Sequence, residues 1–287
     1  MRVDEEARRT VVFIGHETSG SFLPVGTGFL AGVRYKSTDF VFVVTADHVI
    51  DLIPEDTISI RMNRKAGDAS AIKISKSTKI PSLDPNADLA LFPLPPSHDI
   101  YDHSVVLLDR EEYRKIVEEI WTPKLGEEIA VVGLYASHYG SVKNIPVVRV
   151  GHIAMMPDEP VLTQRGCYLR AYLMEVHSII GLSGSPVYFN VPPTRIKEGK
   201  PQYLEGRTAF CMGVMLGYHL VSSAEDQIIT PRHQGGSVTS EYSLEERNTG
   251  FAVVVPIEKL FDLVETREMK KLFDEEIGRR NKGRQHA

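Results

Sequence analysis

The chain has 287 residues, of which 42% are apolar and 25% are charged, with a formal net charge of −5. This composition is ordinary for a soluble globular protein and allows one large domain or two lobes. The negative charge gives no global field for nucleic acid, and the lack of an apolar run of about 18 residues predicts no membrane span. The charged first ten residues lack the apolar core of a signal peptide, and only two cysteines occur, so we expect a cytoplasmic protein.

The first hundred residues consist of short β-prone runs separated by turn signals. Residues 40–45 form a mostly apolar, β-branched run that predicts a buried strand, and residues 57–62 alternate as a half-exposed strand does. Further strands are expected at residues 11–14, 71–74 and 88–94. Closely spaced strands of this kind predict a β-sandwich or barrel and not βαβ units.

A helix is predicted at residues 109–121, where Asp109 is followed by acidic residues in the first turn and by apolar residues on one side. We place it in the connection between two halves of the molecule. Strands are then expected at residues 128–134, 146–153, 167–176, 187–189, 209–216 and 250–255.

Apolar residues near helical spacing predict a closing helix after Pro256, with a basic tail from Gly278 that we expect to fray. Two long connections, at residues 190–207 and 221–249, are expected to be functional or disordered. The second of these is a candidate gate or docking loop.

A serine among glycines is the most distinctive local pattern in the chain. Ser183 lies between Gly181 and Gly184, and Pro186 follows. Glycine allows positive φ and close backbone approach, and two amides aimed into one concavity form an anion site. An exposed serine beside such donors suits acyl transfer. Taken alone, however, the pattern is more typical of an ordinary loop between two strands.

Two other residues with complementary chemistry lie beside apolar runs. His48 follows the strand at 40–45, and Asp88 opens the next apolar run. A serine hydroxyl needs an adjacent base, and that base needs a carboxylate to fix its tautomer. Singly, each residue has an ordinary explanation as a surface histidine or a turn aspartate. Asp47 and Asp84 offer the same chemistry as Asp88, although Asp47 would point away from His48 within a strand.

With these residues in the order His, Asp, Ser, the sequence resembles the trypsin/chymotrypsin-like serine peptidases, in particular the bacterial members related to the HtrA group. Three blocks carry the resemblance: Thr-Ala-Asp-His-Val around His48, Ala-Asp-Leu-Ala-Leu around Asp88, and Gly-Leu-Ser-Gly-Ser-Pro around Ser183. Weaker matches such as Gly-Thr-Gly-Phe-Leu at residues 26–30 lie in the same order. The resemblance extends over residues 11–265.

The resemblance implies an all-β fold of two six-stranded antiparallel β-barrels with a C-terminal helix and an active site between the barrels. The expected regions are an N-terminal extension at 1–10, a first barrel at 11–108, a linker with a short helix at 109–124, a second barrel at 125–256, and a C-terminal helix and basic tail at 257–287. No PDZ-like domain is expected after the peptidase region.

The resemblance also implies a serine endopeptidase. Ser183 would attack a peptide carbonyl, His48 would move the proton and Asp88 would orient His48. The backbone N–H groups of Gly181 and Ser183 would form the oxyanion hole. A peptide substrate would add a strand, and the substrate-binding residues expected from the family are His177, Ser178, Met212, Gly213, Val214 and Met215.

Two residues depart from the family pattern. Leu182 stands where secreted members have an aspartate that pairs with a newly freed N-terminus, so activation by that route is not expected. Ser185 replaces the commoner glycine. No acidic pocket floor is evident, which favours small or apolar side chains at the cleavage site over lysine or arginine.

The main alternative is a catalytically silent trypsin-like module that acts as a protein-binding scaffold. An α/β-hydrolase is excluded because the histidine and aspartate precede the serine and the Gly-x-Ser-x-Gly motif is absent. No metal-binding motif occurs, so neither a metal nor a cofactor is expected. The expected partner is a protein or peptide substrate, with a specific intracellular protein favoured, and the oligomeric state is left open.

Overall fold

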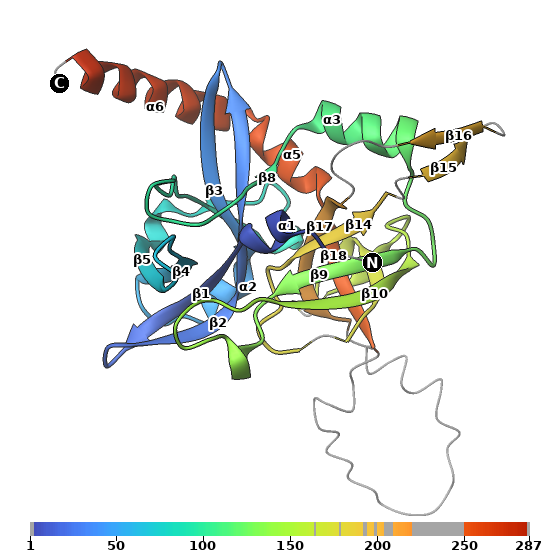
Figure 1. The fold of residues 1–287 in the computed structure, drawn as a ribbon, viewed down its shortest axis with the longest axis horizontal. Helices are drawn as coiled ribbons and strands as arrows, with labels where there is room; N and C mark the ends of the chain where they lie inside the picture. Colours follow the sequence, from blue (N-terminus) through green and yellow to red (C-terminus); the bar gives the residue numbers. More distant parts are fainter. Residues whose placement is uncertain are drawn as a thin grey trace, which may run out of the picture.

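The computed structural model describes residues 3–163, 165–177, 179–191, 194–197, 200–203, 209–219 and 250–285. These residues are mostly β, in two groups of strands that follow one another along the chain and lie side by side (Figure 1). The predicted all-β class is therefore confirmed. The loop predicted at residues 221–249 lies outside the described residues.

The N-terminal half is an eight-stranded sheet built around three long strands. These are β1 (Val11–Thr18), β2 (Ser21–Tyr35) and β3 (Thr38–Ala46). On the β1 side the sheet continues with β4 (Thr57–Asn63) and β5 (Ala69–Ser75), and on the β3 side with β7 (Leu89–Pro93) and β6 (Ile80–Pro81). The eighth strand, β8 (Val106–Leu107), pairs with β2 in parallel.

Hydrogen bonds do not close this first sheet into the six-stranded barrel that the resemblance implies. Its edges are β5 and β6, which are consecutive in the chain and joined through the 3₁₀ turn η1 (Lys76–Thr78). A link this short reaches roughly 15 Å, so the sheet must curl until its edges approach each other. Strand β6 has only two residues, and Pro81 has no N–H to donate, so no ladder forms across the gap.

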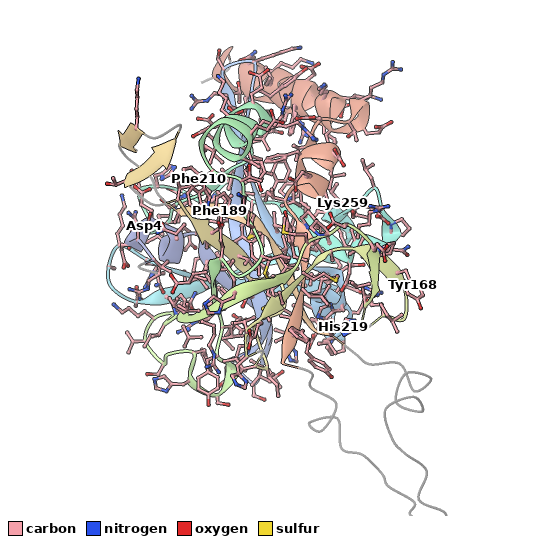
Figure 2. The ribbon with its side chains drawn as sticks, turned by 90° about the vertical axis from the view of Figure 1, so that its right-hand side faces the viewer. Asp4, Tyr168, Phe189, Phe210, His219 and Lys259 are labelled. Atoms are coloured by element: carbon pink, nitrogen blue, oxygen red, sulfur yellow. The ribbon has the colours of Figure 1, made fainter. Side chains whose placement is uncertain are left out.

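The C-terminal half confirms the second predicted barrel. Six antiparallel strands close in the order β10-β13-β18-β17-β14-β9. Their bounds are β9 (Glu128–Gly133), β10 (Val147–Met155), β13 (Tyr172–Glu175), β14 (Pro186–Asn190), β17 (Ala209–Tyr218) and β18 (Phe251–Pro256). Apolar side chains fill its core, and the rings of Phe189 and Phe210 lie 5.9 Å apart between neighbouring strands (Figure 2).

Two small hairpins lie outside the barrel ladder. One joins β11 (Pro160–Leu162) to β12 (Tyr168–Arg170), and the other joins β15 (Thr194–Lys197) to β16 (Lys200–Tyr203). The second hairpin falls in the connection at 190–207 that was expected to be functional or disordered, so part of that connection is ordered. Its strands were not predicted, because four-residue strands rich in polar residues give little periodic signal.

Helices cover the ends of the two halves. The predicted linker helix is confirmed as α3 (Arg110–Arg114), which continues into the π-helical turn η3 (Lys115–Ile120). A short helix, α1 (Glu5–Arg9), was not predicted, although the Asp4 side chain caps it by accepting the Ala7 N–H at 2.8 Å. Asp4 followed by two glutamates is a start signal that sequence reasoning could have used.

The closing helix is divided in two, α5 (Glu258–Val264) and α6 (Arg267–Gln285). Thr266 starts the second by accepting the Met269 N–H on its side-chain oxygen at 3.1 Å. The expected fraying from Gly278 is not observed, since α6 stays helical to Gln285. Within the described residues, no helix is long and apolar enough to cross a membrane.

The two halves share apolar packing where they meet. One buried cluster combines first-half residues with residues on the outer side of the second barrel, including Tyr188 and Val253. Tyr188 is fully buried, and its hydroxyl lies 3.0 Å from the Thr10 side-chain oxygen. Near this packing, Thr27 in the middle of β2 and the end of β3 contact the turn that contains Ser183.

Candidate functional site: a His-Asp pair and a serine turn

His48 and Asp88 are brought together by the pairing of β3 with β7. The register places Ala46 opposite Leu89, so the residues just after β3 and just before β7 share one end of the sheet. The sequence placed His48 at the end of the strand, but His48 lies in the short helix α2 (Asp47–Asp51). Asp88 follows the 3₁₀ turn η2 (Pro85–Ala87) with a left-handed backbone, at φ 52° and ψ 43°.

The Asp88 carboxylate holds both the ring and the backbone of His48. Its Oδ2 is 2.6 Å from His48 Nδ1, and its Oδ1 accepts the His48 backbone N–H at 3.0 Å. The Asp88 carbonyl also accepts the Asp47 N–H at 2.8 Å. Because a carboxylate can only accept, Nδ1 carries the hydrogen, and the neutral ring presents Nε2 as an acceptor. That is the tautomer a general base requires.

Asp88 is ionised in this environment. It is only 4% exposed, and burial, the largest influence, opposes its charge. The hydrogen bonds from His48 and from Arg165 outweigh that burial and hold the pKa of Asp88 below its ordinary value. The carboxylate is therefore available as a charged partner for an imidazolium.

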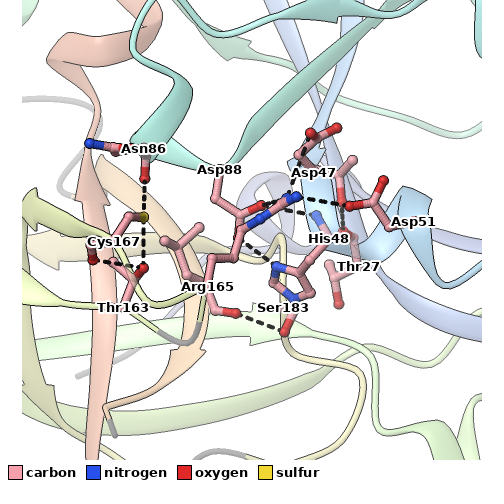
Figure 3. A network of polar contacts seen from close by, with 12 residues as sticks. Thr27, Asp47, His48, Asp51, Asn86, Asp88, Thr163, Arg165, Cys167 and Ser183 are labelled. Carbon is pink, nitrogen blue, oxygen red and sulfur yellow. Dashed lines mark hydrogen bonds and ion pairs between the residues drawn. The ribbon is translucent and has the colours of Figure 1, made fainter. Parts of the chain in front are cut away.

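Arg165 is a member of this cluster that sequence reasoning missed. It lies between β11 and β12 in the second half, and its Nη1 donates to Asp88 Oδ1 at 2.7 Å (Figure 3). Its Nη2 donates to Asp51 Oδ2 at 3.0 Å, and Asp47 Oδ2 lies 3.7 Å from Nη1. Hydrogen bonding to Asp88 raises the pKa of Arg165. No sequence motif marks this residue, because its contacts cross 77 positions of the chain.

The other carboxylates that could have replaced Asp88 are engaged elsewhere. Asp47 Oδ1 accepts from Lys79 at 2.8 Å, and Asp84 Oδ2 accepts from Lys259 at 2.7 Å. Asp47 and His48 both lie in the short helix α2 and not in a strand, so the expectation that strand alternation points Asp47 away from His48 is corrected. Asp88 is the carboxylate that bonds the His48 ring.

Ser183 faces the same junction from the second half. In Figure 3 the His48 ring lies between the Asp88 carboxylate and the Ser183 side chain. The serine hydroxyl, however, donates to the Leu216 carbonyl at 2.9 Å and not to His48. The three predicted residues are thus neighbours, and the Ser183 hydroxyl would have to rotate before it could donate to Nε2.

Thr27, on β2, clamps the serine turn from the first half. Its hydroxyl donates to the Gly181 carbonyl at 2.6 Å and accepts the Leu134 N–H at 2.8 Å. Its backbone N–H donates to the Ser183 carbonyl at 2.9 Å. Thr27 is completely buried. Its place in Gly-Thr-Gly-Phe-Leu was noted in the sequence only as a secondary family match, and the clamp could not be read from that match.

Gly184 is required by both conformation and space. Its φ is +84°, and an added Cβ would collide with the Thr27 carbonyl oxygen and the Thr45 hydroxyl. Thr45 is only three residues before His48, so the serine turn packs directly on the end of β3. A side chain at this position would separate the serine from the histidine.

Leu182 anchors the turn without the aspartate that the family resemblance led us to compare it with. It is fully buried and belongs to the second-barrel core. The next departure, Ser185, is also fully buried, and its Oγ has no hydrogen-bond partner. Gly133 makes room for Ser185, since a Cβ at Gly133 would collide with that hydroxyl.

The backbone N–H groups of the turn alternate between used and unused. Leu182 donates to the Ile179 carbonyl at 3.2 Å, and Gly184 donates to the Met215 carbonyl at 2.7 Å. Within the described part of the chain, the N–H groups of Gly181 and Ser183 donate to no protein acceptor. The Ile180 carbonyl accepts the Ala136 N–H at 3.3 Å, and a trans peptide points its N–H the opposite way, so the Gly181 N–H faces away from Ala136.

The predicted substrate strand at Met212 to Met215 needs correction. Val214 pairs with Pro186 of β14 on one side and with Val255 of β18 on the other. Met212, Val214 and Met215 are also fully buried, and Gly213 is paired on both sides. A strand can accept a new partner only along a free edge. The β14 ladder ends at the Pro186–Val214 pair, and the Met215 backbone bonds Gly184 and Ser185 of the serine turn, so Leu216 and Gly217 are the first residues beyond these contacts.

Of the two residues expected before the serine turn, His177 is exposed and Ser178 lies outside the described residues. Ile180 is 84% exposed. Searched over the described residues alone, the structure contains no group of three or more His, Cys, Asp or Glu side chains that could hold a metal ion.

No protein-family model and no curated protein matches the chain. Among solved structures, it is similar to a crystal structure of Deg5, with 18% identity and a TM-score of 0.44 over 74% of this chain and 81% of that chain. It is also similar to the crystal structure of the inactive form of Rv3671c protease, with 13% identity and a TM-score of 0.46 over 90% of this chain and 88% of that chain.

Proposed function

We propose that the protein is a serine endopeptidase in which Ser183, His48 and Asp88 form the catalytic triad. The observation that carries this proposal is the His48–Asp88 pair, whose 2.6 Å hydrogen bond assigns the hydrogen of the neutral ring to Nδ1 and leaves Nε2 as the acceptor, with the ring between Asp88 and Ser183. A histidine fixed in this tautomer by a buried, ionised carboxylate is an effective general base. An ordinary surface loop does not require a histidine that is hydrogen-bonded to a buried carboxylate.

In the proposed reaction, His48 Nε2 takes the proton from the Ser183 hydroxyl as its oxygen attacks the peptide carbonyl. The new C–O bond gives a tetrahedral intermediate, and its oxyanion is stabilised by the Gly181 and Ser183 N–H groups, which donate to no acceptor among the described residues. His48 then gives its proton to the leaving amine as the C–N bond breaks. Water, activated by the same base, releases the acyl group from Ser183.

The substrate would pair as an added strand beginning at Leu216, beyond the contacts of β14 and the serine turn. In the resting structure the Leu216 carbonyl accepts the Ser183 hydroxyl. A substrate N–H that bonded this carbonyl would displace the serine and allow it to turn to His48. Substrate binding would thus activate the nucleophile. Hydrogen bonds in catalytic sites commonly become aligned only in the complex.

A silent protein-binding module is the second candidate, and one observation favours it. The Ser183 hydroxyl bonds Leu216 and not the base, which leaves the nucleophile inactive in this state. The two candidates differ in whether the serine ever reacts. A binding module would keep its affinity for a partner after loss of the Ser183 hydroxyl and would not cleave that partner.

Hydrolysis of a broad peptide library separates the candidates. The wild-type protein is expected to cleave library peptides, and Ser183→Ala is expected to reduce kcat by about 10⁴–10⁶. Ser185→Ala is the matched control, because it removes a neighbouring hydroxyl that makes no hydrogen bond. Equal cleavage by Ser183→Ala and wild type, or no cleavage by a well-folded wild type, would contradict the proposal.

A further inference from the structure

A cleft of about 410 Å³ lies between α1, the turn after β4 and the chain segment that precedes β10. It contains none of the three proposed catalytic residues. Its volume lies within the range of about 300–1,000 Å³ that is usual for small-molecule sites. The residues that line it come from four separate parts of the sequence, near positions 5–12, 62–67, 102–103 and 143–146, so the cleft is a product of the fold.

The charge that lines this cleft is opposite to that of the whole chain. Five cationic side chains line it, against the carboxylates of Glu5 and Asp102, whereas the chain carries a net charge of −5. The cations are Arg8, Arg9, Arg64, Lys65 and Lys143. The excess of positive charge favours an anionic ligand.

Two of these cations have no counter-ion. Lys65 and Lys143 are exposed and form no ion pair in the described part of the chain, whereas each of the three arginines is paired with a carboxylate. Within the described residues, one buried nitrogen of a lining cation, Arg9 Nε, also has no hydrogen-bond partner, and as an N–H group it suits an anionic acceptor. His103 Nε2 gives no such support, because Nδ1 lies 3.3 Å from the Tyr101 carbonyl and burial lowers the pKa of the ring, so that Nε2 is an acceptor.

We propose that this cleft binds a small polyanion carrying phosphate or carboxylate groups. The unpaired ammonium groups of Lys65 and Lys143 would contact its charged oxygens, and the Arg9 guanidinium would offer its remaining N–H. The cleft is preformed on one side by a buried network. Arg61 donates to Asn144 Oδ1 at 2.9 Å, and Asn144 Nδ2 donates to the Arg61 carbonyl at 2.7 Å.

The same chain segment connects this cleft to the serine turn. Lys143 and Asn144 line the cleft, and Ala136, seven residues before Lys143, holds the Ile180 carbonyl beside Gly181. An anion that restrains Lys143 would therefore restrain the segment that orients the Gly181 peptide. This second step rests on the proposed function, and we expect an occupied cleft to change the reactivity of Ser183.

Binding is tested without any activity readout, by calorimetric titration of the full chain with inorganic pyrophosphate and, in parallel, with citrate. The double variant Lys65→Ala/Lys143→Ala is expected to weaken binding about tenfold and to reduce its salt dependence. Both lysines are exposed, so folding should be unchanged. The control is Lys115→Ala/Lys124→Ala, which removes two exposed lysines outside the cleft and should bind as wild type does.

Tighter binding of pyrophosphate than citrate supports a phosphate ligand, and the reverse supports a carboxylate ligand. No binding of either anion, or equal binding by the wild type and the Lys65/Lys143 double variant, overturns the site. The coupling is tested separately by the rate of fluorophosphonate labelling with and without pyrophosphate. An unchanged rate while binding holds overturns the coupling alone, and a protein that never labels overturns the proposed function without affecting the binding result.

Discussion

The His48–Asp88 pair and the Ser183 turn meet at one junction, but only the pair already has the hydrogen bonds that the proposed reaction requires. The pair is complete: Asp88 bonds the His48 ring and backbone and is itself bonded by Arg165. In the turn, the Ser183 hydroxyl is bonded to Leu216. The two N–H groups proposed for the oxyanion are unused in the described structure. The proposed base thus already has its hydrogen-bond partner, whereas the hydroxyl of the proposed nucleophile is bonded away from it.

This difference follows from how each region is built. The pair forms between the ends of two adjacent strands, β3 and β7, so local sheet pairing is sufficient to position it. The turn is held from the opposite half, through the hydrogen bonds of Thr27 and the packing of Leu182. Changes at the pair should therefore act on chemistry, while changes at the clamp should act on both stability and chemistry.

Among changes at Asp88, Thr27 and Arg165, the largest effect is expected from Asp88→Asn. The amide cannot stabilise an imidazolium and would favour the wrong His48 tautomer, so kcat for peptide cleavage should fall about 10⁴-fold, as in other triad enzymes. Asp84→Asn is the matched control, since Asp84 bonds Lys259 and not the histidine. Steady-state kinetics on both variants measure this. Equal losses in the two would show that Asp88 has no special role.

Thr27→Val tests the clamp with an isosteric change. The Gly181 carbonyl and the Leu134 N–H would lose a buried partner, which should lower the free energy of unfolding by about 2–3 kcal/mol and slow the labelling of Ser183. Thr27→Ser keeps the hydroxyl and should restore most of both. Denaturant unfolding and labelling rates should be measured together. If Thr27→Val loses stability but labels at the wild-type rate, the Thr27 hydrogen bonds stabilise the fold without affecting the reactivity of Ser183.

Arg165→Ala is expected to have the smallest effect, because Arg165 acts through Asp88 as a positioning residue. Its loss removes a hydrogen bond that lowers the pKa of Asp88, so that pKa should rise. Without Arg165, the Asp88 carboxylate would interact with the His48 imidazolium alone. The acidic limb of the pH profile for labelling should therefore move to higher pH, and the maximal rate should change by less than about tenfold. Arg165→Lys should give an intermediate profile. An unshifted profile in Arg165→Ala would mean that this contact has no part in the chemistry.

The β class and most strands could be predicted from the sequence because strands such as β3 are apolar, β-branched and bounded by turn residues. The closure of the first half could not. Whether β5 pairs with β6 depends on Pro81 and on a two-residue strand at the far edge, which no periodic pattern records. The helix at Glu5 to Arg9 had a capping signal in Asp4 that went unused.

The site was predictable where it depends on residue type in a local block. His48, Asp88 and Ser183 each lie in a recognisable block, and the structure places them at one junction. Arg165 and the Thr27 clamp depend on contacts between the two halves, which a single sequence does not reveal. Met212 to Met215 were predicted to receive a substrate strand, but β14 and β18 already flank this segment, and which residues they cover is set by strand register.

The central claim is that the Ser183 hydroxyl becomes a nucleophile beside His48. Intact-mass and peptide-mapping mass spectrometry after treatment with a fluorophosphonate tests it most directly. One phosphonate adduct on Ser183 is predicted for the wild type and for Ser185→Ala, and none for Ser183→Ala or His48→Ala. A folded wild type that gains no adduct, or an adduct that persists in Ser183→Ala, would contradict the account.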